Sequence, residues 1–136
     1  MSASVSLQDV ILAALLADMG VQALVGNRIY DRAPSDPGLV YPHVTFGPSD
    51  YVPDDADCIT GRIEDVQLDI WSRDQGRKWK CKAIVDAVKA ALHDHEADMG
   101  DHALVSMRVM LCRVLDDPDG STVHGVVQVE AVIDEG

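Results

Sequence analysis

Two long segments in which apolar and polar residues alternate close the chain, and the short stretch DDPDGS joins them. In the first segment, residues 103–115, one face carries Val105, Met107, Val109 and Leu111. In the second, residues 121–133, one face carries Val123, Val127, Val129, Ala131 and Ile133. A period of two residues is typical of a half-buried β-strand. Pro118 presets a turn and Gly120 suits a left-handed loop position, so the pattern predicts a C-terminal β-hairpin.

A third alternating segment, residues 62–72, precedes a segment with helical periodicity. Val66, Leu68 and Ile70 share one face of this strand, which leaves Trp71 on the polar face. The following segment predicts a helix over residues 76–93, capped by Ser72 or Asp74. Its apolar stripe consists of Ile84, Ala87, Val88, Ala91 and Leu92.

The N-terminal part of the chain predicts a second helix and shorter elements. Ser6 with Asp9 resembles a helix N-cap, so we expect a helix over residues 7–18 that Gly20 ends. VQALVG adds a helical turn, NRIYD predicts a short strand, and RAPSDPGLVYP is a loop because it contains three prolines.

Two further segments complete the prediction. Alternation in HVTFGPSD indicates a half-buried strand. The acidic segment 49–61 has no periodicity, so we expect an exposed, mobile loop that orders on assembly.

Together these elements predict an α+β fold in which residues 1–136 form a single domain. The sheet is expected to be antiparallel with four to five strands, to include the C-terminal hairpin, and to carry two main helices on one face. A chain of 136 residues with 47% apolar residues is long enough and apolar enough to bury a core.

The charge and the cysteines restrict the functional classes. A formal charge of −12 argues against a general nucleic-acid binder, which normally has a basic surface. Cys58, Cys81 and Cys112 are widely spaced and odd in number, which supports neither a zinc site nor a disulfide framework. The apolar N-terminal run lacks a basic region and is too short to span a bilayer, so we expect no membrane contact.

No motif assigns a catalytic role, so we expect a protein that is not an enzyme and has no cofactor. His93, His95 and His102 lie among acidic residues and supply metal-ligand types. His-x-His on a helix separates the two rings by about 200°. A polar helix end is therefore favoured over a metal site, although a small cytoplasmic ligand- or metal-binding α+β protein stays an alternative.

Five of the eleven basic residues lie within ten positions: Arg73, Arg77, Lys78, Lys80 and Lys82. The start of a helix disfavours cations, so helix stability does not explain the cluster. Two explanations stay open, namely compensation of neighbouring acids such as Asp69 and Asp74, or contact with an acidic protein surface. An acidic surface could be a second copy of this chain in a head-to-tail contact.

Several quoted segments together resemble one known family: LQDVILAALLAD, LVGNRIYDRAP, YPHVTFG, VQLDIWSRDQGRKWKCKAIVDAVKAAL and DDPDGSTVHGVVQVEAVI. They are similar to the tail-completion, or tail-terminator, proteins of long-tailed phages and gene-transfer agents. The most specific combination is WSR before the helix with DPDG and HG in the last hairpin. The resemblance covers nearly the whole chain.

The resemblance implies a structural virion protein, made in the bacterial cytoplasm, that forms a hexameric ring at the head–tail junction. Such a ring ends the tail tube at its head-proximal end and joins the tail to the head connector. The implied partners are further copies of the chain, the tail tube protein and the connector, while DNA passes through without specific binding. A head-closure, or stopper, protein of the same particle stays an alternative.

From the residue types we expect two kinds of surface in such a ring. The candidate protein-interface residues are Tyr51, Val52, Trp71, Arg73, Arg77 and Lys78. Basic side chains in a channel would retain DNA through its phosphates, so we expect an acidic channel lining. The candidate channel residues are Asp54, Asp55, Asp57, Asp116, Asp117 and Asp119.

Overall fold

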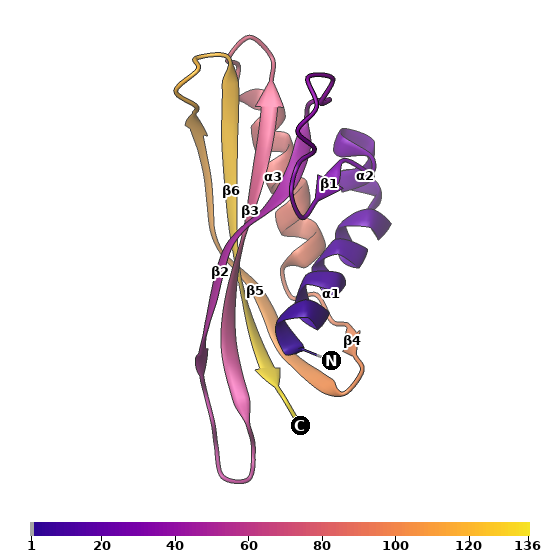
Figure 1. The fold of residues 1–136 in the computed structure, drawn as a ribbon, viewed down its shortest axis with the longest axis vertical. Helices are drawn as coiled ribbons and strands as arrows, with labels where there is room; N and C mark the ends of the chain where they lie inside the picture. The colour runs from indigo at the N-terminus through magenta and orange to yellow at the C-terminus, as the bar shows by residue number, and fades with distance from the viewer. Residues whose placement is uncertain (1) are drawn as a thin grey trace.

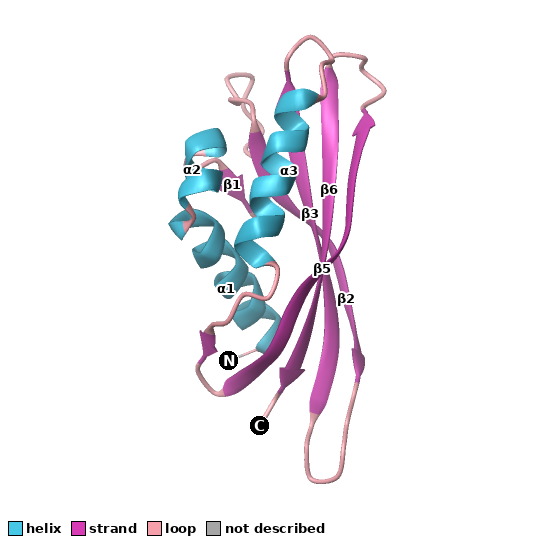
Figure 2. Ribbon diagram, turned by 180° about the vertical axis from the view of Figure 1, so that it is seen from behind, coloured by secondary structure: helices cyan, strands magenta, loops and turns pink. Residues whose placement is uncertain are grey.

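Six strands form one mixed sheet in the order β1-β2-β3-β6-β5-β4, and three helices lie on one side of it (Figures 1 and 2). The computed structural model describes residues 2–136. The helices are α1 (Ala3–Ala17), α2 (Met19–Val25) and α3 (Trp79–Leu92). The strands are β1 (Ile29–Tyr30), β2 (His43–Pro53), β3 (Gly61–Arg73), β4 (Asp98–Met99), β5 (His102–Asp116) and β6 (Thr122–Asp134).

The predicted α+β class is confirmed, but the predicted sheet is too small. The short strands β1 and β4 add to the two edges and make the sheet six-stranded, and β1 pairs with β2 in parallel, so the sheet is mixed. The predicted helical turn after the first helix is the complete short helix α2.

The core lies between α3 and the centre of the sheet. The stripe residues Ile84, Val88 and Leu92 are buried, as the periodicity predicts, and Cys81 and Val85 join them. All five residues predicted on one face of β6 are also buried. Leu7, Ile11 and Leu15 of α1 complete the same core.

The predicted helix caps are wrong. Ser2 is the N-cap of α1, so the helix begins earlier than predicted and Ser6 is buried within it. Asp18 rather than Gly20 separates α1 from α2, because its carboxylate accepts a hydrogen bond from Val21 N at 2.9 Å and starts the second helix.

The start of α3 also differs from the prediction. Ser72 belongs to β3, and Lys78 occupies the N-cap position of α3 without a side-chain hydrogen bond. A turn precedes the helix, in which Gln75 and Gly76 adopt left-handed φ angles of 57° and 74°. This turn uses the residues that were expected to form the first helical turn.

The C-terminal hairpin is present, but its first strand does not keep a single apolar face. The side chains of Val105 and Leu111 are 65% and 38% exposed, whereas Met107 on the predicted face is buried. The register of β5 against β6 shifts between Leu104 and Ser106 and again between Val109 and Leu111. Each bulge inserts one residue and turns the following side chains to the opposite face.

The bulges of the two long outer strands coincide on one row of the sheet. β2 bulges between Phe46 and Ser49, opposite Gln67 of β3. Gln67 pairs with Gln128 of β6, and Gln128 is where the second bulge of β5 occurs. Because bulges increase local twist, we attribute the strong twist of the sheet at mid-height to this row (Figure 2).

The predicted loop over residues 49–61 is partly strand. β2 continues to Pro53 and pairs with the start of β3, from Val52 opposite Ile63 to Ser49 opposite Val66. All residues from 48 to 60 are exposed, and we call this segment the hairpin tip. It projects beyond the helices at one end of the molecule (Figure 1). Its alternation carries no core residues, which is why its sequence resembles that of a loop.

Candidate assembly surfaces

The hairpin tip exposes the apolar and acidic residues predicted there. Tyr51 and Val52 are 51% and 58% exposed, so both are available to a partner. The tip also exposes Asp54, Asp55 and Asp57. Asp55 accepts a hydrogen bond from Gly61 N at 3.0 Å, which closes the loop.

An ion-pair cluster fixes the base of the hairpin. Arg62 contacts the buried Glu64 at 3.3 Å and also binds Glu135 near the C-terminus. Its guanidinium lies 3.8 Å from the centroid of the Tyr51 ring. Ser4 of α1 donates a 2.9 Å hydrogen bond to Glu64. The hydrogen bond to Glu135 raises the pKa of Arg62, so the guanidinium stays charged. Through Ser4 and Glu135, the cluster connects both ends of the chain to β3.

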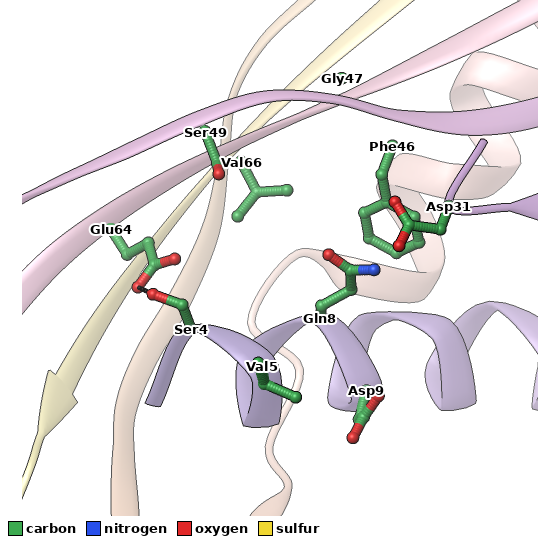
Figure 3. Close-up of a pocket in the computed structure, with 10 residues that line it drawn as sticks. All are labelled: Ser4, Val5, Gln8, Asp9, Asp31, Phe46, Gly47, Ser49, Glu64 and Val66. Carbon is green, nitrogen blue, oxygen red and sulfur yellow. Dashed lines mark hydrogen bonds between the residues drawn. The ribbon is translucent and has the colours of Figure 1, made fainter. Parts of the chain in front are cut away.

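A pocket of about 400 Å³ lies beside this cluster, between the start of α1 and strands β2 and β3 (Figure 3). Glu64, Gln8 and Ser49 contribute polar groups to its lining, and Phe46 and Val66 contribute apolar groups. The Glu64 carboxylate is already bound by Ser4 and Arg62. Its charge is therefore compensated within the fold.

The opposite end of the molecule holds Trp71, on the sheet face that points away from the helices. Trp71 is half-buried, stacks on His124 with centroids 4.1 Å apart, and donates a hydrogen bond to Thr45 Oγ1. His124 Nε2 lies 2.7 Å from Asp69 Oδ1. Trp71 is thus on the predicted polar face, but most of its surface is used within the subunit.

The basic cluster and the turn of the C-terminal hairpin, which lie far apart in the sequence, meet at this end. Arg73 donates a 2.9 Å hydrogen bond to Thr122 Oγ1 and lies 3.7 Å from Asp119. Lys78 pairs with Asp116 at 3.1 Å. Compensation of acids therefore explains part of the cluster, but the acids differ from those suggested by sequence proximity. The Arg77 side chain, by contrast, is exposed and, among residues 2–136, forms a hydrogen bond only with the side chain of Gln75.

The turn itself is held by Asp119. Its carboxylate accepts hydrogen bonds from the Thr122 hydroxyl at 2.6 Å and from the backbone N–H groups of Ser121 and Thr122. These hydrogen bonds, that of the Thr122 side chain first, lower the pKa of Asp119. The turn between β5 and β6, which carries Asp117 and Asp119, lies at the end of the molecule opposite to the hairpin tip (Figure 1).

Sequence reasoning missed the exposed apolar residues of β5. Val105, Met110, Leu111 and Leu115 are 65%, 58%, 38% and 38% exposed along a strand at the side of the sheet. Strict alternation assigned Val105 and Leu111 to the core and left Met110 without a role. Apolar residues at consecutive positions, as in VML, break the alternation and were the available signal for a bulge.

The histidines predicted as alternative metal ligands serve separate contacts. His93 Nδ1 accepts a hydrogen bond from Val109 N, and His102 Nδ1 lies 3.1 Å from Glu135 O. Within residues 2–136, no group of three His, Cys, Asp or Glu side chains could hold a metal ion. Burial raises the pKa of the Cys81 thiol to about 11, which keeps it protonated at neutral pH.

No single helix in the part of the chain described is long and apolar enough to cross a membrane. Helices α1 and α2 taken together are long and apolar enough, but the chain bends by 81° between them, at Asp18. Leu7, Ile11 and Leu15 of α1 are fully buried in the core.

A small α+β fold with a projecting hairpin and exposed apolar residues along a sheet edge is typical of a subunit that works through contacts with other proteins. The chain belongs to the tail completion protein gp17 family, whose sequence model matches residues 9–134. The resemblance seen in the sequence motifs is confirmed. The protein is a tail completion protein, a structural component of the tail of a phage-like particle.

Two solved structures share the fold. A chain in the virion of a native gene transfer agent particle has a TM-score of 0.90 at 22% identity, with 98% of each chain covered. The gp17 protein of bacteriophage SPP1 has a TM-score of 0.60 at 20% identity, with 95% of this chain and 89% of that chain covered. A search of curated proteins found no match.

Proposed function

We propose that this protein assembles as a hexameric ring that ends the tail tube at its head-proximal end and joins the tail to the head connector. The observation that carries the proposal is the family match over residues 9–134, which covers almost every helix and strand. Exposed apolar residues on β5 and on the hairpin tip supply surfaces for contacts between subunits. The surface on β5 and the surface on the hairpin tip differ in composition, which favours a head-to-tail contact between them. Head-to-tail contacts form a ring when the rotation between neighbouring subunits closes.

Of the two acidic segments, the hairpin tip is the better candidate for the channel lining. Asp116 and Asp119 already pair with Lys78 and Arg73. Asp54, Asp55 and Asp57 form no ion pair with any residue from 2 to 136. An unpaired acidic lining would repel the phosphates of DNA in transit.

Native mass spectrometry and particle assembly test this function. We expect a species of about six times the 14.7 kDa subunit mass. Particles made without the protein should contain tails of uncontrolled length that are not joined to heads. A protein that stays monomeric at every concentration, or normal joined tails in its absence, would contradict the proposal.

Arg77 is the basic residue best suited to test a contact with an acidic partner. Arg77→Glu is expected to weaken binding to the tail tube or connector about tenfold, since a rim charge mainly affects encounter and orientation. The melting temperature should not change, because within residues 2–136 the Arg77 side chain is hydrogen-bonded only to Gln75, and the bond from Arg77 N to Asp74 O does not involve the side chain.

Arg73→Glu is the comparison variant. It removes the hydrogen bond to Thr122 and places a carboxylate beside Asp119, so it should lower the melting temperature as well. Unchanged binding of Arg77→Glu to both partners would show that Arg77 is only a solvated side chain.

A further inference from the structure

The corner between α1 and α2 leaves apolar residues exposed. Met19, the first residue of α2, is 87% exposed, although methionine is among the residues most often buried. Leu16 and Leu24 are 40% and 38% exposed. We call this surface the helix corner, and its exposed apolar residues are Leu16, Ala17, Met19, Gly20, Ala23 and Leu24. An exposed apolar patch of this kind is typical of a contact site.

The two polar side chains within residues 16–24 are bound to the backbone near them. The Asp18 carboxylate accepts a hydrogen bond from Val21 N at 2.9 Å, and Gln22 Nε2 donates one to Gly26 O at 2.7 Å. Asp18 is also the only charged residue from Val10 to Gly26. The helix corner therefore offers a partner an apolar surface with a single negative charge.

The C-terminal half of β5 carries a second apolar surface. Met110, Leu111 and Leu115 are 58%, 38% and 38% exposed, and we call these three residues the β5 surface. Leu115 pairs with His124 of β6, so it lies on the sheet face that points away from the helices, and Leu111 shares this face. Arg113 lies between them and is the only charged residue from 110 to 115.

The β5 surface begins where the cover on the earlier part of this strand ends. The segment after α3 runs beside β5, where Asp94 N donates a 2.8 Å hydrogen bond to Met107 O and His93 Nδ1 accepts one from Val109 N at 3.1 Å. Only the residues after Val109 are therefore available to a partner along this half of the strand.

The two surfaces lie on opposite sides of the molecule at similar height. α2 leads into β1, the first strand in the sheet order, whereas β5 lies towards the other edge. Figures 1 and 2 show α2 and the C-terminal half of β5 level with each other on the two sides. Identical subunits placed side by side in one orientation therefore bring the helix corner of one to the β5 surface of the next.

The charges favour the same arrangement. Each surface is apolar around one charged residue, and these two residues, Asp18 and Arg113, have opposite signs. A symmetric contact between two helix corners, or between two β5 surfaces, would instead bring like charges together. Electrostatic complementarity of this kind selects the partner and its orientation.

We propose that the helix corner of one subunit packs against the β5 surface of the next, so that every subunit in the ring uses one surface of each kind. The contact removes both apolar surfaces from water. Val105, near the start of β5, lies outside this contact and is left for the hairpin tip. The inference rests on the ring proposed above and specifies its subunit contact.

A single charge placed in each surface tests the contact. Met19→Glu and Leu111→Glu are each expected to raise the protein concentration needed for half-assembly of the ring at least about tenfold, because a carboxylate in an apolar contact loses its water. Glutamate is favourable in the first turn of a helix, and Arg113 neighbours Leu111 on the same face, so neither change should unfold the subunit. Circular dichroism spectra that match the wild type establish this.

Mixing the two variants distinguishes a head-to-tail contact from a symmetric one. The Met19→Glu subunit keeps an intact β5 surface, and the Leu111→Glu subunit keeps an intact helix corner, so one intact contact can form between them. The mixture should therefore give one-to-one dimers and nothing larger, at a concentration where each variant alone is monomeric. Native mass spectrometry with one variant isotope-labelled measures the composition of these species.

Trp79→Glu is the matched control. Trp79 is the first residue of α3 and is 61% exposed, but it belongs to neither surface, so this variant should assemble like the wild type. Rings of undiminished stability in both test variants, dimers formed by Leu111→Glu alone, or no dimer in the mixture would each overturn the contact and leave the ring proposal standing. A wild type that is monomeric even at high concentration would overturn both.

Discussion

Replacing Gly125 by alanine is expected to lower the free energy of unfolding by about 3 kcal/mol, the upper range for overpacking a well-packed core. Gly125 lies in β6 between Ile70 of β3 and Val114 of β5. A Cβ atom at this position would lie 2.7 Å from Val85 Cγ2 and 2.9 Å from Cys81 Sγ of α3. Both side chains are buried, so they have little space to move. Glycine is therefore what permits α3 to approach β6 this closely.

Denaturant unfolding of matched variants measures this effect. Val85→Ala in the Gly125→Ala background removes the closest atom and should restore part of the loss, which a double-mutant cycle quantifies. Gly38→Ala is the control, since its Cβ would approach only the Asp36 carboxylate in an exposed loop, at 3.4 Å. A Gly125→Ala protein as stable as the wild type would show that α3 can shift without cost.

Replacing Arg62 by methionine is expected to destabilise the fold by about 3–5 kcal/mol, the typical cost of leaving one partner of a buried ion pair uncompensated. The Glu64 side chain is only 3% exposed and that of Arg62 12%. Without the guanidinium, Glu64 retains the Ser4 hydroxyl as its hydrogen-bond donor. A serine hydroxyl does not neutralise a buried carboxylate.

The double variant Arg62→Met with Glu64→Leu distinguishes the ion pair from simple packing. Replacing both charges by apolar side chains should recover most of the loss, because no charge is then left buried. Arg113→Met, at an exposed position of β5, should change stability by less than about 0.5 kcal/mol. Thermal unfolding of the four proteins measures these differences. A double variant no more stable than Arg62→Met would contradict this account.

Segments with one regular period were the parts of the fold that could be predicted from sequence. α3 and β6 each keep one apolar face, so both elements were predicted close to their observed positions and most of their predicted face residues are buried, although the start of α3 and the burial of Cys81 and Val85 were missed. The buried face of β5 was predicted wrongly because each bulge reverses the alternation, and the sequence pattern does not indicate where a bulge lies. The strand within residues 49–53 was missed because an exposed strand has no apolar face to produce a pattern.

The candidate surfaces show a different limit. Trp71 and Arg73 were selected for their residue types, yet much of their surface is used by His124, Thr45 and Thr122 within the same subunit. Sequence proximity suggested Asp69 and Asp74 as partners of the basic cluster. In the folded chain, Asp119 and Asp116 at the turn between β5 and β6 instead pair with Arg73 and Lys78 of the basic cluster. Such pairings depend on topology, which local patterns do not specify.

Because the β2–β3 hairpin projects from the molecule, its length can change during evolution without changes in the core. The hairpin tip buries no residue from 48 to 60, so residues can be inserted or removed there without changing the packing of the helices. Each residue in a strand adds about 3.3 Å, so a matched two-residue insertion in both strands lengthens the hairpin by about 7 Å and keeps every side chain on its face. A one-residue change would instead move Tyr51 and Val52 each to the face opposite to the one it now occupies. Length differences between hairpins of related proteins should therefore occur in even steps, which would adapt one fold to partner proteins of different dimensions.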